Sequence, residues 1–129
     1  MYRVLAGALL LAAMIGAFSM SSRAARDVTT PLPAGARELV VFETDNCIYC
    51  GLMRRDVVPD YMKSQRAAEV PIRFVNVSHA TPPEASLAEP LTVVPTIVLM
   101  DDGREVSRIT GYAGPENFFH MVSHMLSRN

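Results

Sequence analysis

The feature that most constrains this chain is a pair of cysteines, Cys47 and Cys50, that stands between a strand pattern and a helix pattern. Residues 38–43 are rich in β-branched and aromatic residues and are followed by polar ones, which predicts a buried strand leading towards Cys47. After Cys47, apolar residues recur at helical spacings and predict an amphipathic helix, with Asp45 and Asn46 as suitable caps. The apolar positions of this helix are Ile48, Leu52, Met53, Val57 and Val58. Cys47 is therefore expected at a helix start.

The spacing of the two cysteines favours chemistry over a structural role. A bridge across two residues closes a very short loop and removes little chain entropy, so it would be a weak staple. A sulfur at a helix start faces free amide groups that lower the pKa of a thiol placed there. The second sulfur lies about one turn further on, within reach of the first. We expect Cys47 to attack a disulfide as the nucleophile and Cys50 to resolve the mixed disulfide.

The remaining patterns predict an α/β domain in the order βα-β-(α)-ββα. In chain order they are a helical piece over 60–68 behind Pro59, a strand over 70–77, a short helix begun at Thr81 and stopped by Pro90, a strand over 92–100 interrupted by Pro95, a turn at 101–103, a strand over 104–109, and a helix opened by Pro115. One strand-helix-strand unit followed by a hairpin and a helix gives a mixed four-stranded sheet flanked by helices.

Residues 1–24 have the order of a secretory signal peptide: a positive charge, an uncharged apolar run and then small residues. The apolar run is shorter than the roughly 20 residues of a membrane span, which favours cleavage over an uncleaved anchor. Cleavage after Ala24 leaves a linker at 25–36 and a folded domain at 37–129. Both outcomes place the domain outside the cytoplasm, and the bacterial periplasm, where disulfides persist, is the expected compartment.

Composition narrows the classes of function. The chain has 129 residues and a net charge of -1, with charges of both signs scattered along it. It has the size of one compact domain and lacks the basic stripe of a nucleic-acid binder, so no nucleic-acid partner is expected. We expect a monomer that needs no cofactor.

The cysteine pair, the strand before it, the helix after it and Val94-Pro95 at a later strand start together resemble the thioredoxin superfamily. The resemblance covers about residue 38 to the C-terminus, and it implies a thioredoxin fold close to the minimal glutaredoxin-like core. It implies that Pro95 is cis and shapes a groove beside Cys47, and that the Val94 backbone pairs with substrate. An ordinary trans proline at a strand start is the alternative for Pro95.

Two departures from cytoplasmic thioredoxins concern the preceding strand and the residues between the cysteines. Val41 stands near the position of the family's buried aspartate, so the usual proton acceptor is missing. Glu43 could serve as the base, although a solvated carboxylate at the strand end is the favoured interpretation. Ile48 and Tyr49 replace the family's glycine-proline. This pair, with the leader, resembles the small periplasmic thioredoxins that accompany bacterial sulfur-oxidation systems.

The resemblance implies a thiol-disulfide oxidoreductase that acts on exported proteins with disulfides or reactive cysteines. Oxidants of the superfamily commonly carry a histidine between the cysteines, and Ile48 and Tyr49 offer no such group. We therefore expect a reductase, which needs electrons from a membrane thiol-relay protein. A disulfide-forming oxidant or an isomerase of the same fold is the alternative.

Metal binding is the competing class of function. Cys47 and Cys50 could join His120 and His124, which stand four residues apart on the last helix, to bind zinc or copper. The two histidines also fit the polar face of that helix, opposite its apolar stripe, and a solvated face is the favoured interpretation. No metal site is therefore expected.

Overall fold

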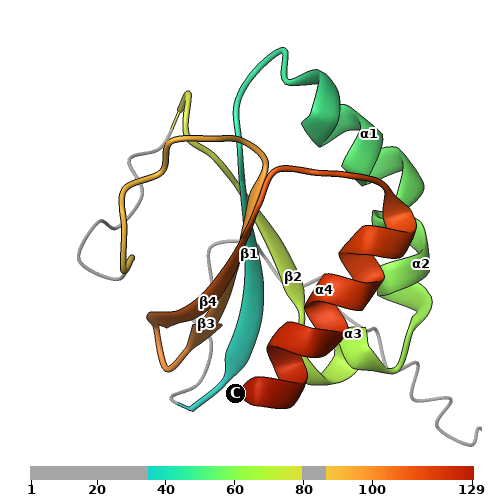
Figure 1. Cartoon of the computed structure of the whole chain (residues 1–129), viewed down its shortest axis with the longest axis vertical. Coiled ribbons are helices and arrows are strands. Elements are labelled where there is room, and N and C mark those ends of the chain that lie inside the picture. Colours follow the sequence, from blue (N-terminus) through green and yellow to red (C-terminus); the bar gives the residue numbers. More distant parts are fainter. Residues whose placement is uncertain (1–34, 80–86) are drawn as a thin grey trace, which may run out of the picture.

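The computed structural model describes residues 35–79 and 87–129, which form one mixed sheet and four helices (Figure 1). In chain order the elements are β1 (Arg37–Glu43), α1 (Ile48–Asp56), α2 (Val58–Lys63), α3 (Arg66–Glu69), β2 (Ile72–Asn76), β3 (Thr96–Asp101), β4 (Arg104–Thr110) and α4 (Pro115–Arg128). The signal peptide, most of the linker and the short helix expected from Thr81 lie outside the described residues.

The sheet has the order β2-β1-β3-β4, and it is mixed as the sequence predicts. β1 runs parallel to β2 and antiparallel to β3, while β3 and β4 form an antiparallel hairpin. Phe42 pairs with Thr96, so β1 ends where β3 begins. The connection from β1 to α1 and the coil entering β3 therefore meet at one end of the sheet, at the top of Figure 1.

The two central strands are buried on both faces because each face carries its own apolar cluster. On one face Leu39 and Val41 of β1 pack with side chains from α1, α2 and α4. On the other face Val40 and Phe42 pack with β3 and with the coil that carries Leu87 and Leu91. All four described helices lie on the first face (Figure 1), so helices on both faces are not seen in the described part of the chain.

The helical region after the cysteines breaks twice. Pro59 lies in the first turn of α2, where its missing amide donor costs nothing, and α1 has already ended at Asp56. The expected single piece over 60–68 is wrong, because Ser64 adopts an extended backbone and its hydroxyl donates to the Tyr61 carbonyl. α3 then begins separately.

The predicted tight turn between the last two strands is confirmed. Asp102 and Gly103 both have positive φ, 49° and 74°, which is the backbone that two-residue hairpin turns require. Within the described residues, none of the helices has the length and apolar character needed to cross a bilayer.

Candidate active site

Cys47 is itself the N-cap of α1, and its sulfur accepts a hydrogen bond from the Cys50 amide at 3.2 Å. The two sulfurs form a disulfide with an S–S distance of 2.05 Å. The expectation that Asp45 or Asn46 caps the helix is wrong. Asn46 instead takes a positive φ of 58°, which turns the chain into the helix, and the Asp45 carboxylate binds elsewhere.

The two cysteines differ in their access to solvent. Cys50 is buried, with 3% of its surface exposed, whereas Cys47 is half-buried. Ile48 and Tyr49 stand between the two cysteines. They are 76% and 60% exposed and form an apolar surface beside the disulfide. A protein that exchanges disulfides here therefore meets Cys47 first.

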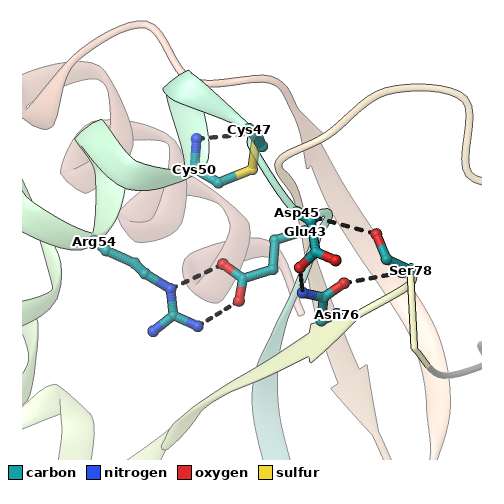
Figure 2. A network of polar contacts seen from close by, with 7 residues as sticks. All are labelled: Glu43, Asp45, Cys47, Cys50, Arg54, Asn76 and Ser78. Atoms are coloured by element: carbon teal, nitrogen blue, oxygen red, sulfur yellow. Dashed lines mark hydrogen bonds and ion pairs between the residues drawn. A yellow bond between two sulfur atoms is a disulfide. The ribbon is translucent and has the colours of Figure 1, made fainter.

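Glu43 ends β1 and reaches towards Arg54 on α1, the helix that carries the cysteines (Figure 2). The guanidinium donates two hydrogen bonds to the carboxylate, at 2.9 Å and 2.5 Å, and lies 3.7 Å from the centroid of the Phe74 ring. The side chain of Glu43 is only 12% exposed, so the interpretation as a solvated carboxylate is wrong. Its hydrogen bonds raise the pKa of Arg54.

An open groove of about 470 Å³ runs beside the disulfide. It is lined by Glu43, Thr44, Asp45, Asn46, Cys47, Ile48, Cys50, Gly51 and Arg54. The groove places the ion pair and both cysteines along one surface. A disulfide lying in it would meet the carboxyl groups of Glu43 and Asp45 and the Arg54 guanidinium along the same surface as the reacting sulfurs.

A second polar network fixes the loop that precedes Cys47, and the sequence gives little sign of it. The Asn76 amide donates to the Asp45 carboxylate at 2.8 Å, and the Asp45 amide donates to the Ser78 hydroxyl at 3.1 Å (Figure 2). His79 approaches the same carboxylate at 2.9 Å. These contacts need the parallel pairing of β1 with β2, which no local pattern reveals.

The Val94–Pro95 peptide is cis, as the resemblance implies, and the trans interpretation does not apply. Pro95 is buried and its carbonyl accepts a hydrogen bond from the Gly111 amide at 2.8 Å. Val94 is half-buried and immediately precedes the pairing of β3 with the end of β1. The sheet thus brings Val94 and Pro95 to the end at which Cys47 lies; their roles towards substrate stay predictions.

The proposed Cys₂His₂ set does not assemble. His120 and His124 are exposed on α4, and the cysteines are joined to each other. Across residues 35–79 and 87–129, no three His, Cys, Asp or Glu residues gather in a group that could hold a metal ion.

The chain is similar to known proteins in sequence and in structure. A family model described as a thioredoxin-like domain matches residues 26–126. The reduced periplasmic thioredoxin SoxS from Paracoccus pantotrophus is 30% identical, with a TM-score of 0.65 over 70% of this chain and 96% of that chain. Thioredoxin from Fasciola hepatica is 24% identical, with a TM-score of 0.56 over 71% of this chain and 83% of that chain.

Thioredoxin from Malassezia sympodialis is 16% identical, with a TM-score of 0.59 over 71% of this chain and 76% of that chain. The Fasciola and Malassezia structures share the fold with this chain. No curated protein sequence matches.

Proposed function

This chain belongs to the thioredoxin superfamily and is a thiol-disulfide oxidoreductase, and from that premise we propose that it reduces disulfides of exported proteins in the bacterial periplasm. The direction of electron transfer depends on the groups around the Cys47 sulfur. Cys47 caps α1, and the residues between it and Cys50 are the exposed Ile48 and Tyr49. The amides of the helix start stabilise a Cys47 thiolate, but no cationic side chain stands between the cysteines to stabilise it further. Weak stabilisation of the thiolate keeps the dithiol form reducing.

The proposed reaction begins with both cysteines reduced. The Cys47 thiolate attacks one sulfur of a substrate disulfide, that S–S bond breaks, and the second substrate sulfur leaves as a thiolate that takes up a proton. Cys50 then loses its proton and attacks the Cys47 sulfur of the mixed disulfide. The Cys47–Cys50 disulfide forms, the first substrate sulfur leaves, and two electrons have passed to the substrate.

The roles of the two cysteines follow from their exposure. A macromolecular disulfide can reach the half-buried Cys47, whereas Cys50 is buried beneath it. The Val94 backbone, at the same end of the sheet, is proposed to pair with the substrate chain, and the cis Pro95 to shape the substrate-binding surface beside Cys47. Glu43, held by Arg54 in the groove lining, is the proposed acceptor for the Cys50 proton.

The compartment and the partners rest on the N-terminal leader and on the similarity to a periplasmic thioredoxin. A reductase in an oxidising compartment must be reduced again after each turnover. We propose that a membrane thiol-relay protein supplies those electrons and that the protein acts as a monomer. A link to sulfur oxidation is proposed from the same similarity.

The deciding experiment is a redox titration of the Cys47–Cys50 pair against dithiothreitol or glutathione buffers. We expect a potential near the roughly -270 mV of a reducing thioredoxin. A potential near roughly -120 mV, typical of a strong oxidant, would reject the reductase in favour of a disulfide-forming enzyme.

Trapping tests the roles of the cysteines independently of direction. Cys50→Ser removes the resolving thiol, so substrates should stay covalently bound to Cys47 and be recovered from a periplasmic extract. Cys47→Ser is the matched control and should trap nothing. Adducts on Cys50 in place of Cys47 would reverse the assignment.

A further inference from the structure

We propose that Glu105 and Arg108 of β4 form a clamp that positions the coil of residues 88–95 for substrate binding, and so set the affinity for macromolecular disulfides. The inference rests on the proposed use of Val94 as a backbone contact for substrate. Neither clamp residue is proposed to touch substrate. Both act through the coil and are positioning residues.

The clamp joins three backbone groups of the coil to one ion pair. Arg108 donates to both carboxylate oxygens of Glu105, at 2.5 Å and 2.6 Å. The same guanidinium donates to the Glu89 carbonyl at 2.8 Å and to the Pro90 carbonyl at 3.4 Å. The Ala88 amide donates to Glu105 at 2.8 Å. The guanidinium thus holds the carbonyls of Glu89 and Pro90 while the carboxylate holds the Ala88 amide, so the ion pair fixes three successive residues of the coil.

Burial makes this pair distinct from an ordinary surface ion pair. The side chains of Glu105 and Arg108 are 4% and 17% exposed, which is less than the other bidentate pair of the sheet, Glu38 with Arg73, at 16% and 35%. Desolvation of Glu105 opposes its ionisation, but the hydrogen bonds from Arg108 and Ala88 still lower its pKa. A buried, charged and fully hydrogen-bonded pair holds its geometry more firmly than a solvated one.

The far end of the coil is anchored as well. The Thr96 hydroxyl donates to the Val93 carbonyl at 2.7 Å, and the Gly111 amide donates to the Pro95 carbonyl at 2.8 Å. Leu91, between the two anchors, packs against the apolar cluster of the second sheet face. The clamp is therefore one of two attachments that hold the exposed Val93 and the half-buried Val94 in place.

Val94 is the part of this coil suited to bind another chain. Among the hydrogen bonds of the described residues, none uses the Val94 backbone amide or carbonyl. A partner strand can therefore pair with it, as extended peptides do at an open edge. Holding the coil before binding lowers the ordering cost of the complex, so loosening the clamp should weaken binding without altering the sulfur chemistry.

Arg108→Lys tests the clamp because lysine keeps the charge but loses the fork that reaches Glu105 and two carbonyls together. Two substrates are compared: insulin, a protein disulfide, and the small disulfide 5,5′-dithiobis(2-nitrobenzoate), which needs no backbone pairing. We expect KM for insulin to rise about tenfold with kcat retained, because a small displacement of a positioning contact is costly. The rate constant for the small disulfide and the redox potential should stay unchanged.

Arg73→Lys is the matched control, since it disrupts the bidentate pair of Arg73 on β2 with Glu38 on β1 and leaves β4 and the coil untouched. It should leave KM for insulin unchanged. An unchanged KM in Arg108→Lys, or an equal loss on both substrates, would overturn the clamp. If Arg108→Lys does not fold, Glu105→Gln takes its place in the same comparison.

Failure of the proposed function has a different signature. If the wild-type protein oxidises thiols and does not reduce insulin, the reductase is rejected. The clamp is then judged by the same KM comparison on a peptide dithiol in place of insulin.

Discussion

Val41 and Glu43 of β1 differ in side-chain chemistry and in surroundings, and both concern the choice of a base for Cys50. Val41 is fully buried in the core. A carboxylate there would need a hydrogen-bonding partner, and the valine side chain has no carboxylate. Glu43, two residues later on the same face of the strand, accepts two hydrogen bonds from the Arg54 guanidinium. A carboxylate therefore stands at the end of the strand and not within it, and it is the group that we propose as the base for Cys50.

Glu43→Gln should slow the second step of disulfide exchange and spare the first. The variant keeps the side-chain volume but removes the proton acceptor, so we expect release of the second thiol to slow about 10-fold or more at pH 7. Stopped-flow absorbance with 5,5′-dithiobis(2-nitrobenzoate) separates the release of the two thiols. Glu38→Gln, which breaks the bidentate pair with Arg73 further from the disulfide, is the control. Equal effects on both phases would contradict a role in proton transfer.

Burial of Tyr61 makes the stability of the folded protein depend on pH. Its hydroxyl donates to the Val70 carbonyl at 2.6 Å, and burial raises the pKa of Tyr61 to about 12. A tyrosine in the unfolded chain has a pKa of about 10, so the native state holds the hydroxyl proton more tightly than the unfolded state does. Its contribution to stability is complete below pH 10 and is lost as pH rises from about 10 towards about 12.

Tyr61→Phe should change the free energy of unfolding at neutral pH and its dependence on pH above pH 10. At pH 7 the free energy of unfolding should fall by about 1–3 kcal/mol, because the Val70 carbonyl loses its partner. Above pH 10 the variant should lose stability less steeply than the wild type. Urea unfolding at pH 7, 10 and 11 measures both effects. A variant with the wild-type slope would show that Tyr61 does not carry this dependence.

The start of α1 is the element that sets the chemistry. Its capping group is the sulfur of Cys47, and the two following residues point an apolar surface to solvent. Sequence periodicity predicts the helix, but the cap differs from the expectation because Asn46 is used to turn the chain. Tertiary contacts of Asp45 with β2 and the turn after it decide which residue remains free to cap.

Ile48→His should make the protein more oxidising. An imidazolium beside Cys47 would stabilise the thiolate and with it the reduced form, so we expect the potential to rise by about 30 mV or more. Redox titration below pH 6.5, where histidine is charged, measures the shift. Met62→His, at another exposed apolar position on α2, is the control and should leave the potential unchanged. Equal potentials in the two variants would contradict local control by the helix start.

The whole molecule couples redox state to folding. The difference in unfolding free energy between the oxidised and reduced chains is set, through ΔG = −nFΔE, by the difference in potential between the native and unfolded cysteine pairs. For a reductase the native pair favours the disulfide more than the unfolded pair does. We therefore expect the oxidised protein to unfold at higher urea concentration, by about 1.4 kcal/mol for each 30 mV.

Urea unfolding monitored with and without reductant measures this difference. Cys47→Ser with Cys50→Ser is the control, and its stability should not change with reductant. A reduced form more stable than the oxidised form would contradict the reductase and indicate an oxidant.

The sequence by itself determined the cysteine pair, its position at a helix start, the order of the four strands, the first and last helices, and the hairpin turn. These depend on local periodicity and turn chemistry, which neighbouring residues specify. Only the tertiary structure decided the pairing of Glu43 with Arg54, the network around Asp45, and the clamp of Glu105 and Arg108. Each joins groups that only the packed fold brings together: β1 to α1, β1 to β2, and β4 to the coil before β3. Such contacts depend on which distant segments pack side by side, and a single stretch of sequence does not specify its distant neighbours.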